Sequence, residues 1–113
     1  MDNNTLSLPL TELSAGGKIY LLKLTALAAV RMEERLGISL YDIIRRSDEV
    51  KMTAELLYTL IESSRPEFTK AEVYDVMDDF ISGGGTLKEL NTVIAEALGN
   101  SGFFGRAPAA RES

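Results

Sequence analysis

The sequence predicts a mainly helical α+β domain, in which an N-terminal β-hairpin is followed by a compact bundle of four to five short helices. Three observations support this fold class. The chain has 113 residues, which suits one hydrophobic core. Its first part alternates polar and apolar residues around glycines, whereas apolar residues recur at helical spacing from Thr25 onward. We therefore expect a single domain at 1–99, with the hairpin at about 5–24, helices at about 25–98, and a Gly/Ala/Pro-rich disordered tail at 100–113.

The hairpin is predicted from two segments with the pattern of β-strands. In "TLSLPL", the alternate residues Leu6, Leu8 and Leu10 share one side, and Pro9, which lacks an N–H donor, restricts the segment to an edge strand. "SAGG" predicts a turn, and "KIYLLKL" at 18–24 is a second strand rich in β-forming residues. Because an isolated hairpin is only marginally stable, we expect this one to pack on the helices or to pair with another chain.

Capping signals divide the remaining sequence into five expected helices. Thr69 with Glu72, and Thr86 with Glu89, each form the spacing of a capping box at a helix start. Glycine after a helical pattern indicates the end of a helix. The expected helices are 25–36, ended by Gly37; 39–46, with Ser39 as the N-cap; 49–63; one from Thr69 to "SGGG"; and one from Thr86 to Gly99.

The third of these helices is expected to be the centre of the core, because its apolar face is very wide. Four polar residues are expected on its opposite, solvent-facing side: Lys51, Glu55, Thr59 and Glu62.

The first helix carries apolar residues on two sides at about 100° per residue. One stripe consists of Ala28, Ala29, Met32 and Leu36, and the other consists of Ala26, Leu27 and Val30. One stripe suffices to pack against the core. Our preferred expectation is that the helix lies between the hairpin and the other helices; the alternatives are that the second stripe contacts a neighbouring subunit or a bound client. Ala26, Leu27 and Val30 are therefore candidate partner-binding residues.

Two aromatic residues, Phe103 and Phe104, interrupt the expected tail. Aromatic residues are uncommon in disordered segments. Two explanations stay open at this point: the pair is a short docking element for a partner, or it folds back onto the helices. We count both residues as candidate partner-binding positions.

The composition excludes several kinds of chemistry. The chain contains no cysteine and no histidine, which rules out disulfides, thiolate chemistry, Cys/His zinc sites and histidine acid–base catalysis. We expect no enzyme activity, no metal site and no cofactor. The net charge of −5 and the scattered basic residues argue against a nucleic-acid partner. The sequence lacks the pattern of a signal peptide or a membrane span, so we expect a cytoplasmic protein without a membrane partner.

The order of these features resembles a known family. A hairpin, then "KLTALAAVRMEERLGISLYDII", then "TKAEVYDVM" is similar to the tail assembly chaperones of long-tailed phages, prophages and gene transfer agents. The resemblance covers most of 22–98. The matching positions are Leu24, Leu27, Glu33, Gly37 and Leu40 in the first block and Thr69, Glu72 and Val73 in the second.

The resemblance implies a function that needs no catalytic residues. Such a protein binds the long helical tape measure protein in the bacterial host cytoplasm, helps to recruit tail tube subunits, and is absent from the mature particle. Members are often also made in a longer form by a ribosomal frameshift. Independently of the resemblance, the hairpin edge and the first helix each offer a contact surface for a homo-oligomer. Two alternatives from other classes stay open: a structural head–tail connector or minor tail component, and a small helical regulatory adaptor.

Overall fold

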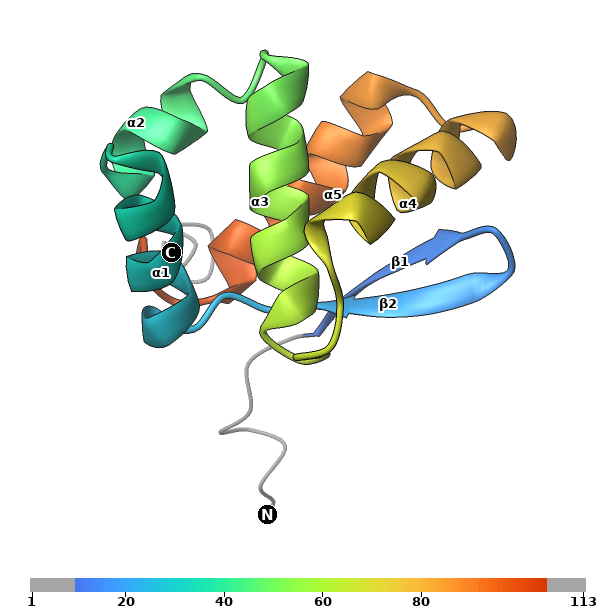
Figure 1. Ribbon diagram of the computed structural model, residues 1–113. Helices are drawn as coiled ribbons and strands as arrows, with labels where there is room; N and C mark the ends of the chain where they lie inside the picture. Colours follow the sequence, from blue (N-terminus) through green and yellow to red (C-terminus); the bar gives the residue numbers. More distant parts are fainter. Residues whose placement is uncertain (1–9, 106–113) are drawn as a thin grey trace, which may run out of the picture.

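The computed structural model describes residues 10–105 and confirms the expected α+β fold. A two-stranded antiparallel hairpin precedes the helices, which surround a shared core (Figure 1). The elements are β1 (Thr11–Ala15), β2 (Lys18–Leu22), α1 (Ala26–Leu36), α2 (Leu40–Arg45), α3 (Val50–Glu62), α4 (Lys70–Ser82) and α5 (Leu87–Asn100).

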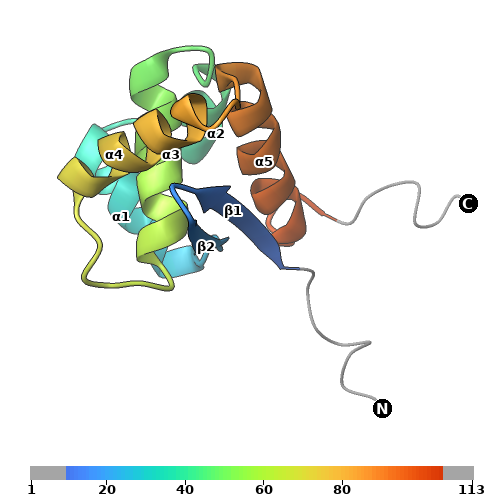
Figure 2. The same ribbon diagram turned by 90° about the vertical axis from the view of Figure 1, so that its right-hand side faces the viewer.

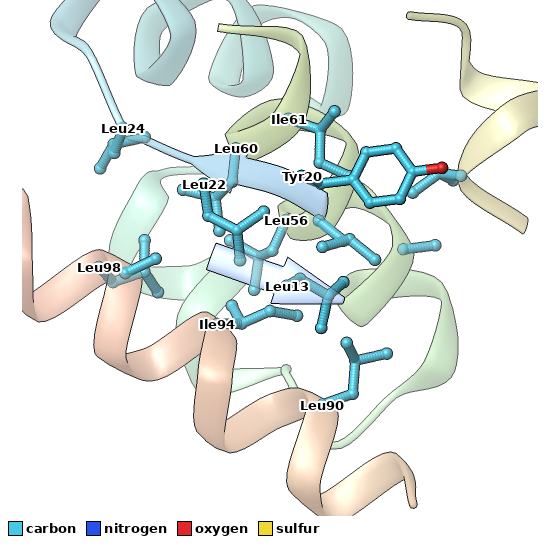
Figure 3. Packing of buried hydrophobic residues seen from close by; sticks show 14 of the residues in the cluster. Leu13, Tyr20, Leu22, Leu24, Leu56, Leu60, Ile61, Leu90, Ile94 and Leu98 are labelled. Atoms are coloured by element: carbon cyan, nitrogen blue, oxygen red, sulfur yellow. The ribbon is translucent and has the colours of Figure 1, made fainter. Parts of the chain in front are cut away.

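Helix α3 is the centre of the fold, as its wide apolar face predicts. It contacts every other helix as well as β2. In Figure 1, α1 and α2 lie on one side of α3 and α4 lies on the other, while α5 crosses behind α3 and the hairpin runs below α4. Figure 2 shows β1 beside α5, in agreement with the contacts between these two elements. Buried leucines and isoleucines from β1, β2, α3 and α5 meet in the interior (Figure 3).

The hairpin uses a different first strand from the one the sequence pattern predicts. Gly16 and Gly17 have φ values of 58° and 77° and form the two-residue turn, so the four-residue turn predicted for "SAGG" is too long. A two-residue turn pairs Ala15 with Lys18, and the partner of β2 must be the five residues directly before the turn, "TELSA". Leu10 lies before this strand and is 69% exposed, and Leu6 and Leu8 lie outside the described residues.

The hairpin packs on its own helices, which is one of the two expected outcomes. Leu13, Tyr20 and Leu22 are buried on its inner face. The Ser64 hydroxyl donates to the Leu21 carbonyl at 3.0 Å, and the Asn100 amide donates to the Thr11 hydroxyl at 2.8 Å. These bonds attach β2 to the end of α3 and β1 to the end of α5.

The helix starts agree with the capping signals. The hydroxyls of Thr25, Ser39, Thr69 and Thr86 each accept a backbone N–H of the first turn, and the latter two helices have complete capping boxes. One predicted end is wrong, because α5 runs through Gly99 to Asn100. Leu98 is buried and the Asn100 side chain bonds to β1, so tertiary contacts outweigh the helix-ending preference of glycine, about 1 kcal/mol.

The close approach of the hairpin turn to α4 generates a stability prediction. A Cβ atom added at Gly16 would lie 2.5 Å from Asp79 Oδ2 and 3.2 Å from Asp79 Cβ, whereas a Cβ at Gly17 meets nothing within 4 Å. Both glycines have positive φ, which costs an alanine about 1–2 kcal/mol. Urea denaturation should show that Gly17→Ala loses only this amount, while Gly16→Ala loses about 1–3 kcal/mol more through the clash. Equal losses in the two variants would show that Asp79 moves aside freely.

Candidate partner-binding surfaces

A buried carboxylate at the junction of three helices is the main polar feature of the interior. Glu55 on α3 is only 5% exposed. Its Oε1 accepts hydrogen bonds from Arg35 Nη2 at 2.8 Å and from Arg35 Nε at 3.2 Å, and its Oε2 pairs with the ammonium of Lys70. The sequence pattern placed Glu55 and Thr59 on the solvent-facing side of α3, and this is wrong, because α1 and α4 bring Arg35 and Lys70 over them.

The environment of Glu55 keeps it ionised. Burial by itself would raise the pKa of this carboxyl, but the hydrogen bonds from Lys70 and Arg35 outweigh burial and hold the pKa below the ordinary glutamate range. The Tyr58 ring adds to the cluster, since the Arg35 guanidinium lies 5.2 Å and the Lys70 ammonium 5.7 Å from its centroid. We call Arg35, Glu55, Tyr58 and Lys70 the Glu55 cluster. Its contacts hold α1 and α4 against α3, which is a structural role.

The α1 outer face, which consists of Ala26, Leu27 and Val30, is open to solvent. Leu27 is 58% exposed and Val30 is 48% exposed, and Ala26 is also exposed. The expected position of α1 between the hairpin and the helices is therefore wrong. The hairpin packs against α3, α4 and α5, so nothing within residues 10–105 covers this face. The opposite stripe behaves as predicted: Ala28, Ala29 and Met32 are buried and Leu36 is partly buried.

A shallow pocket of about 210 Å³ adjoins the α1 outer face. It lies between α1 and the segment that follows α3. Its lining combines apolar surface with hydroxyls and two opposite charges: Thr25, Leu27, Ala28, Arg31, Glu62, Ser63 and Pro66. A partner that covers Leu27 therefore has a neighbouring recess for one of its side chains.

The second pair of candidates, Phe103 and Phe104, follows α5. The ring of Phe104 packs edge-on against Tyr41 of α2, with 5.7 Å between ring centroids. Phe104 also lines an apolar groove of about 290 Å³ between α2 and α5 with Tyr41, Ile44, Ala95, Leu98 and Gly99. Phe104 therefore folds back onto the helices, which is one of the two explanations that the sequence left open. Phe103 is 43% exposed and Phe104 is 37% exposed, so both keep accessible ring surface.

Most of the positions that carry the family resemblance have structural roles here. Glu33 Oε2 accepts a hydrogen bond from the Leu40 backbone N–H at 2.7 Å, which joins α1 to α2. Gly37 ends α1 in the left-handed conformation with φ 74°, and Leu24 is buried. In the second block, Thr69 and Glu72 form the capping box and Val73 is buried. Among the matching positions of the first block, Leu27 is exposed and free to contact a partner.

The described residues contain no group of three His, Cys, Asp or Glu side chains that could hold a metal ion. Between residues 10 and 105, no helix is both long and apolar enough to cross a membrane. A comparison with protein-family models finds no matching model, and searches of curated proteins and of solved structures find no match to this chain. The resemblance to tail assembly chaperones therefore stays a prediction.

The Glu55 cluster predicts a pH-dependent stability. The pKa of the Glu55 carboxyl is lower in the folded chain than in the unfolded chain. The stability that ionised Glu55 contributes is therefore complete above the ordinary glutamate pKa of about 4.3, and it is lost as the pH falls through the folded pKa. Near neutral pH, Glu55→Gln should lower the free energy of unfolding by about 1–3 kcal/mol, and in acid near pH 2 the difference from the unaltered chain should largely vanish. Urea denaturation at both pH values measures this.

Glu96→Gln is the matched control, since Glu96 is exposed on α5 and should change the stability little at either pH. If Glu55→Gln were as stable as the unaltered chain at neutral pH, the two cations would not be stabilising the fold through this carboxylate.

Proposed function

We propose that this protein is a non-enzymatic binding protein of the phage tail assembly chaperone type. In this proposal it holds an apolar helix of the tape measure protein, helps to recruit tail tube subunits in the bacterial cytoplasm, and is absent from the mature particle. The observation that carries the proposal is the α1 outer face, where Leu27 and Val30 are about half exposed on a helix whose other side is already buried. The family resemblance supplies the identity of the client.

The α1 outer face suits a client that is itself a helix. Leu27 and Val30 are three residues apart and lie on neighbouring turns, so they offer one continuous apolar ridge. The small side chain of Ala26 at the start of this ridge lets another backbone approach closely. Burying an exposed leucine or valine completely contributes about 1.5–3 kcal/mol each, and the half-exposed side chains here can contribute a corresponding part.

The α1 helix is held firmly, which favours binding. Thr25 caps its first turn, Gly37 and the bond from Leu40 to Glu33 hold its end, and Arg35 anchors it to Glu55. A surface that is already ordered loses little conformational entropy when a partner binds. The α1 outer face can therefore hold a client without reorganising the fold.

A structural particle component is the second candidate, and the same face supports it. An exposed apolar ridge fits a contact with a neighbouring subunit as well as it fits a transient client. The two candidates differ in where the protein is found after assembly. A chaperone leaves the particle, whereas a head–tail connector or minor tail component stays in it.

We predict that Leu27→Gln/Val30→Gln strongly weakens client capture without unfolding the chain. The full chain is co-expressed with a tagged tape measure protein encoded in the same gene cluster, and the amount of chain that co-purifies is measured. The double variant should reduce this amount at least about tenfold, because two central apolar anchors are lost. Ile19→Gln/Val50→Gln is the matched control: these residues are 61% and 57% exposed on other elements, and the control should co-purify normally.

Mass spectrometry of purified particles separates the two candidate functions. The chaperone proposal expects the tape measure protein to be present in particles and this chain to be absent. Detection of this chain at a fixed copy number per particle would replace the chaperone proposal with a structural role. Normal co-purification of the Leu27/Val30 variant would instead remove the α1 outer face from the proposal.

A further inference from the structure

A second apolar ridge lies on α4, and the function proposed above does not use it. Tyr74, Met77 and Ile81 follow one another at spacings of three and four residues and so share one side of the helix. We call these three residues the α4 stripe. Tyr74 is 52% exposed and Ile81 is 47% exposed, while Met77, which lies between them in the stripe, is 8% exposed. Ile81 continues the apolar spacing of the buried residues Val73 and Val76, yet it is itself exposed.

The geometry of α4 explains why Ile81 is exposed. The start of α4 is held against α3 by the contact between Lys70 and Glu55. From there α4 runs away from α3 toward its C-terminal end (Figure 1). Val73 and Val76 face the core and Phe80 is partly buried against it, whereas Ile81 lies on the same side of α4 as the exposed Tyr74.

The charge around the α4 stripe is strongly one-sided. Residues 67–82 contain five carboxylates and one lysine, so this segment accounts for four of the five net negative charges of the chain. The lysine is Lys70, and its ammonium is already paired with Glu55. Asp75 and Asp78 are exposed on the side of α4 next to the stripe, and Asp78 lies one turn after Tyr74. Within residues 10–105, Asp75 and Asp78 form no ion pair, so a partner that covers the stripe meets two carboxylates without a cation bound to them.

We propose that the α4 stripe is a docking site for a basic amphipathic helix, in which an apolar ridge is flanked by lysine or arginine. The apolar ridge of the partner would cover Tyr74 and Ile81, and its cations would face Asp75 and Asp78. Charge complementarity also decides against a second copy of this chain on the same face, because a symmetric contact would bring the two acidic rims together. This docking site is distinct from the α1 outer face and does not rest on the function proposed above.

Fluorescence anisotropy with two labelled synthetic peptides tests the proposal. Both peptides have the same alanine- and leucine-rich helical sequence with one apolar ridge, and the flanking positions are lysine in one and glutamate in the other. The full chain should bind the lysine peptide at least about tenfold more tightly than the glutamate peptide, and the difference should shrink as salt is added. Equal binding of the two peptides, or no binding of the lysine peptide, would overturn the proposal.

Three double variants locate the binding site on the chain. Tyr74→Gln/Ile81→Gln should weaken binding of the lysine peptide at least about tenfold, since it removes the apolar anchors and keeps every charge. Asp75→Asn/Asp78→Asn should weaken it by up to about tenfold. Glu12→Gln/Glu96→Gln changes the net charge by the same amount at exposed positions on other elements and should leave binding unchanged.

The residues of the first two variants are exposed or half exposed, so the fold should persist, and circular dichroism melting checks this. Should one of the two lose the fold, the other still decides the matter. If the Glu12/Glu96 variant weakened binding as much as the Asp75/Asp78 variant, the lysine peptide would be attracted only by the net charge of the chain. The proposed docking site on α4 would then be wrong. If Leu27→Gln/Val30→Gln abolished binding while Tyr74→Gln/Ile81→Gln did not, the peptide would be binding to the α1 outer face.

Discussion

The arrangement of this fold depends on the burial of one carboxylate, Glu55, between two cations. An ionised side chain that is 5% exposed is tolerated only when its oxygens accept strong hydrogen bonds, and Arg35 and Lys70 supply them. Because the two cations come from α1 and α4, the need to satisfy one buried group holds both helices against α3. Tyr58 lies beside both cations and packs with Phe68, which extends the same junction to the segment before α4.

The exposed surfaces follow from this junction. Arg35 holds one side of α1 against α3, so the opposite side, with Leu27 and Val30, faces solvent. On α4, Val73 and Val76 face the core, so the side of the helix that carries Tyr74 and Ile81 faces solvent. The interior contacts thus leave two apolar ridges exposed. The α1 outer face has charges of both signs around it, and the α4 stripe has acidic residues beside it. A protein without histidine or cysteine can act through such surfaces, since binding needs shape and charge rather than reactive groups.

The elements that were correctly predicted are those whose signals are local. The hydroxyls of Ser39, Thr69 and Thr86 cap helices as predicted, because each bonds within its own first turn. The errors arose where a distant contact outweighed a local preference. "TLSLPL" has better alternation than "TELSA", yet the two-residue turn at Gly16 and Gly17 makes "TELSA" the strand that pairs with β2. Likewise, Gly99 does not end α5, because Leu98 and the Asn100 side chain have partners elsewhere in the fold.

The sequence by itself determined the fold class, the helix starts, the central position of α3 and the presence of a second apolar stripe on α1, because periodicity and capping are properties of neighbouring residues. It also excluded the chemistry that needs histidine or cysteine. Only the tertiary structure decided that Glu55 is buried and that Leu27, Val30 and Ile81 are not. Helical periodicity shows which residues share a face, but whether that face is covered depends on the other elements that pack around it.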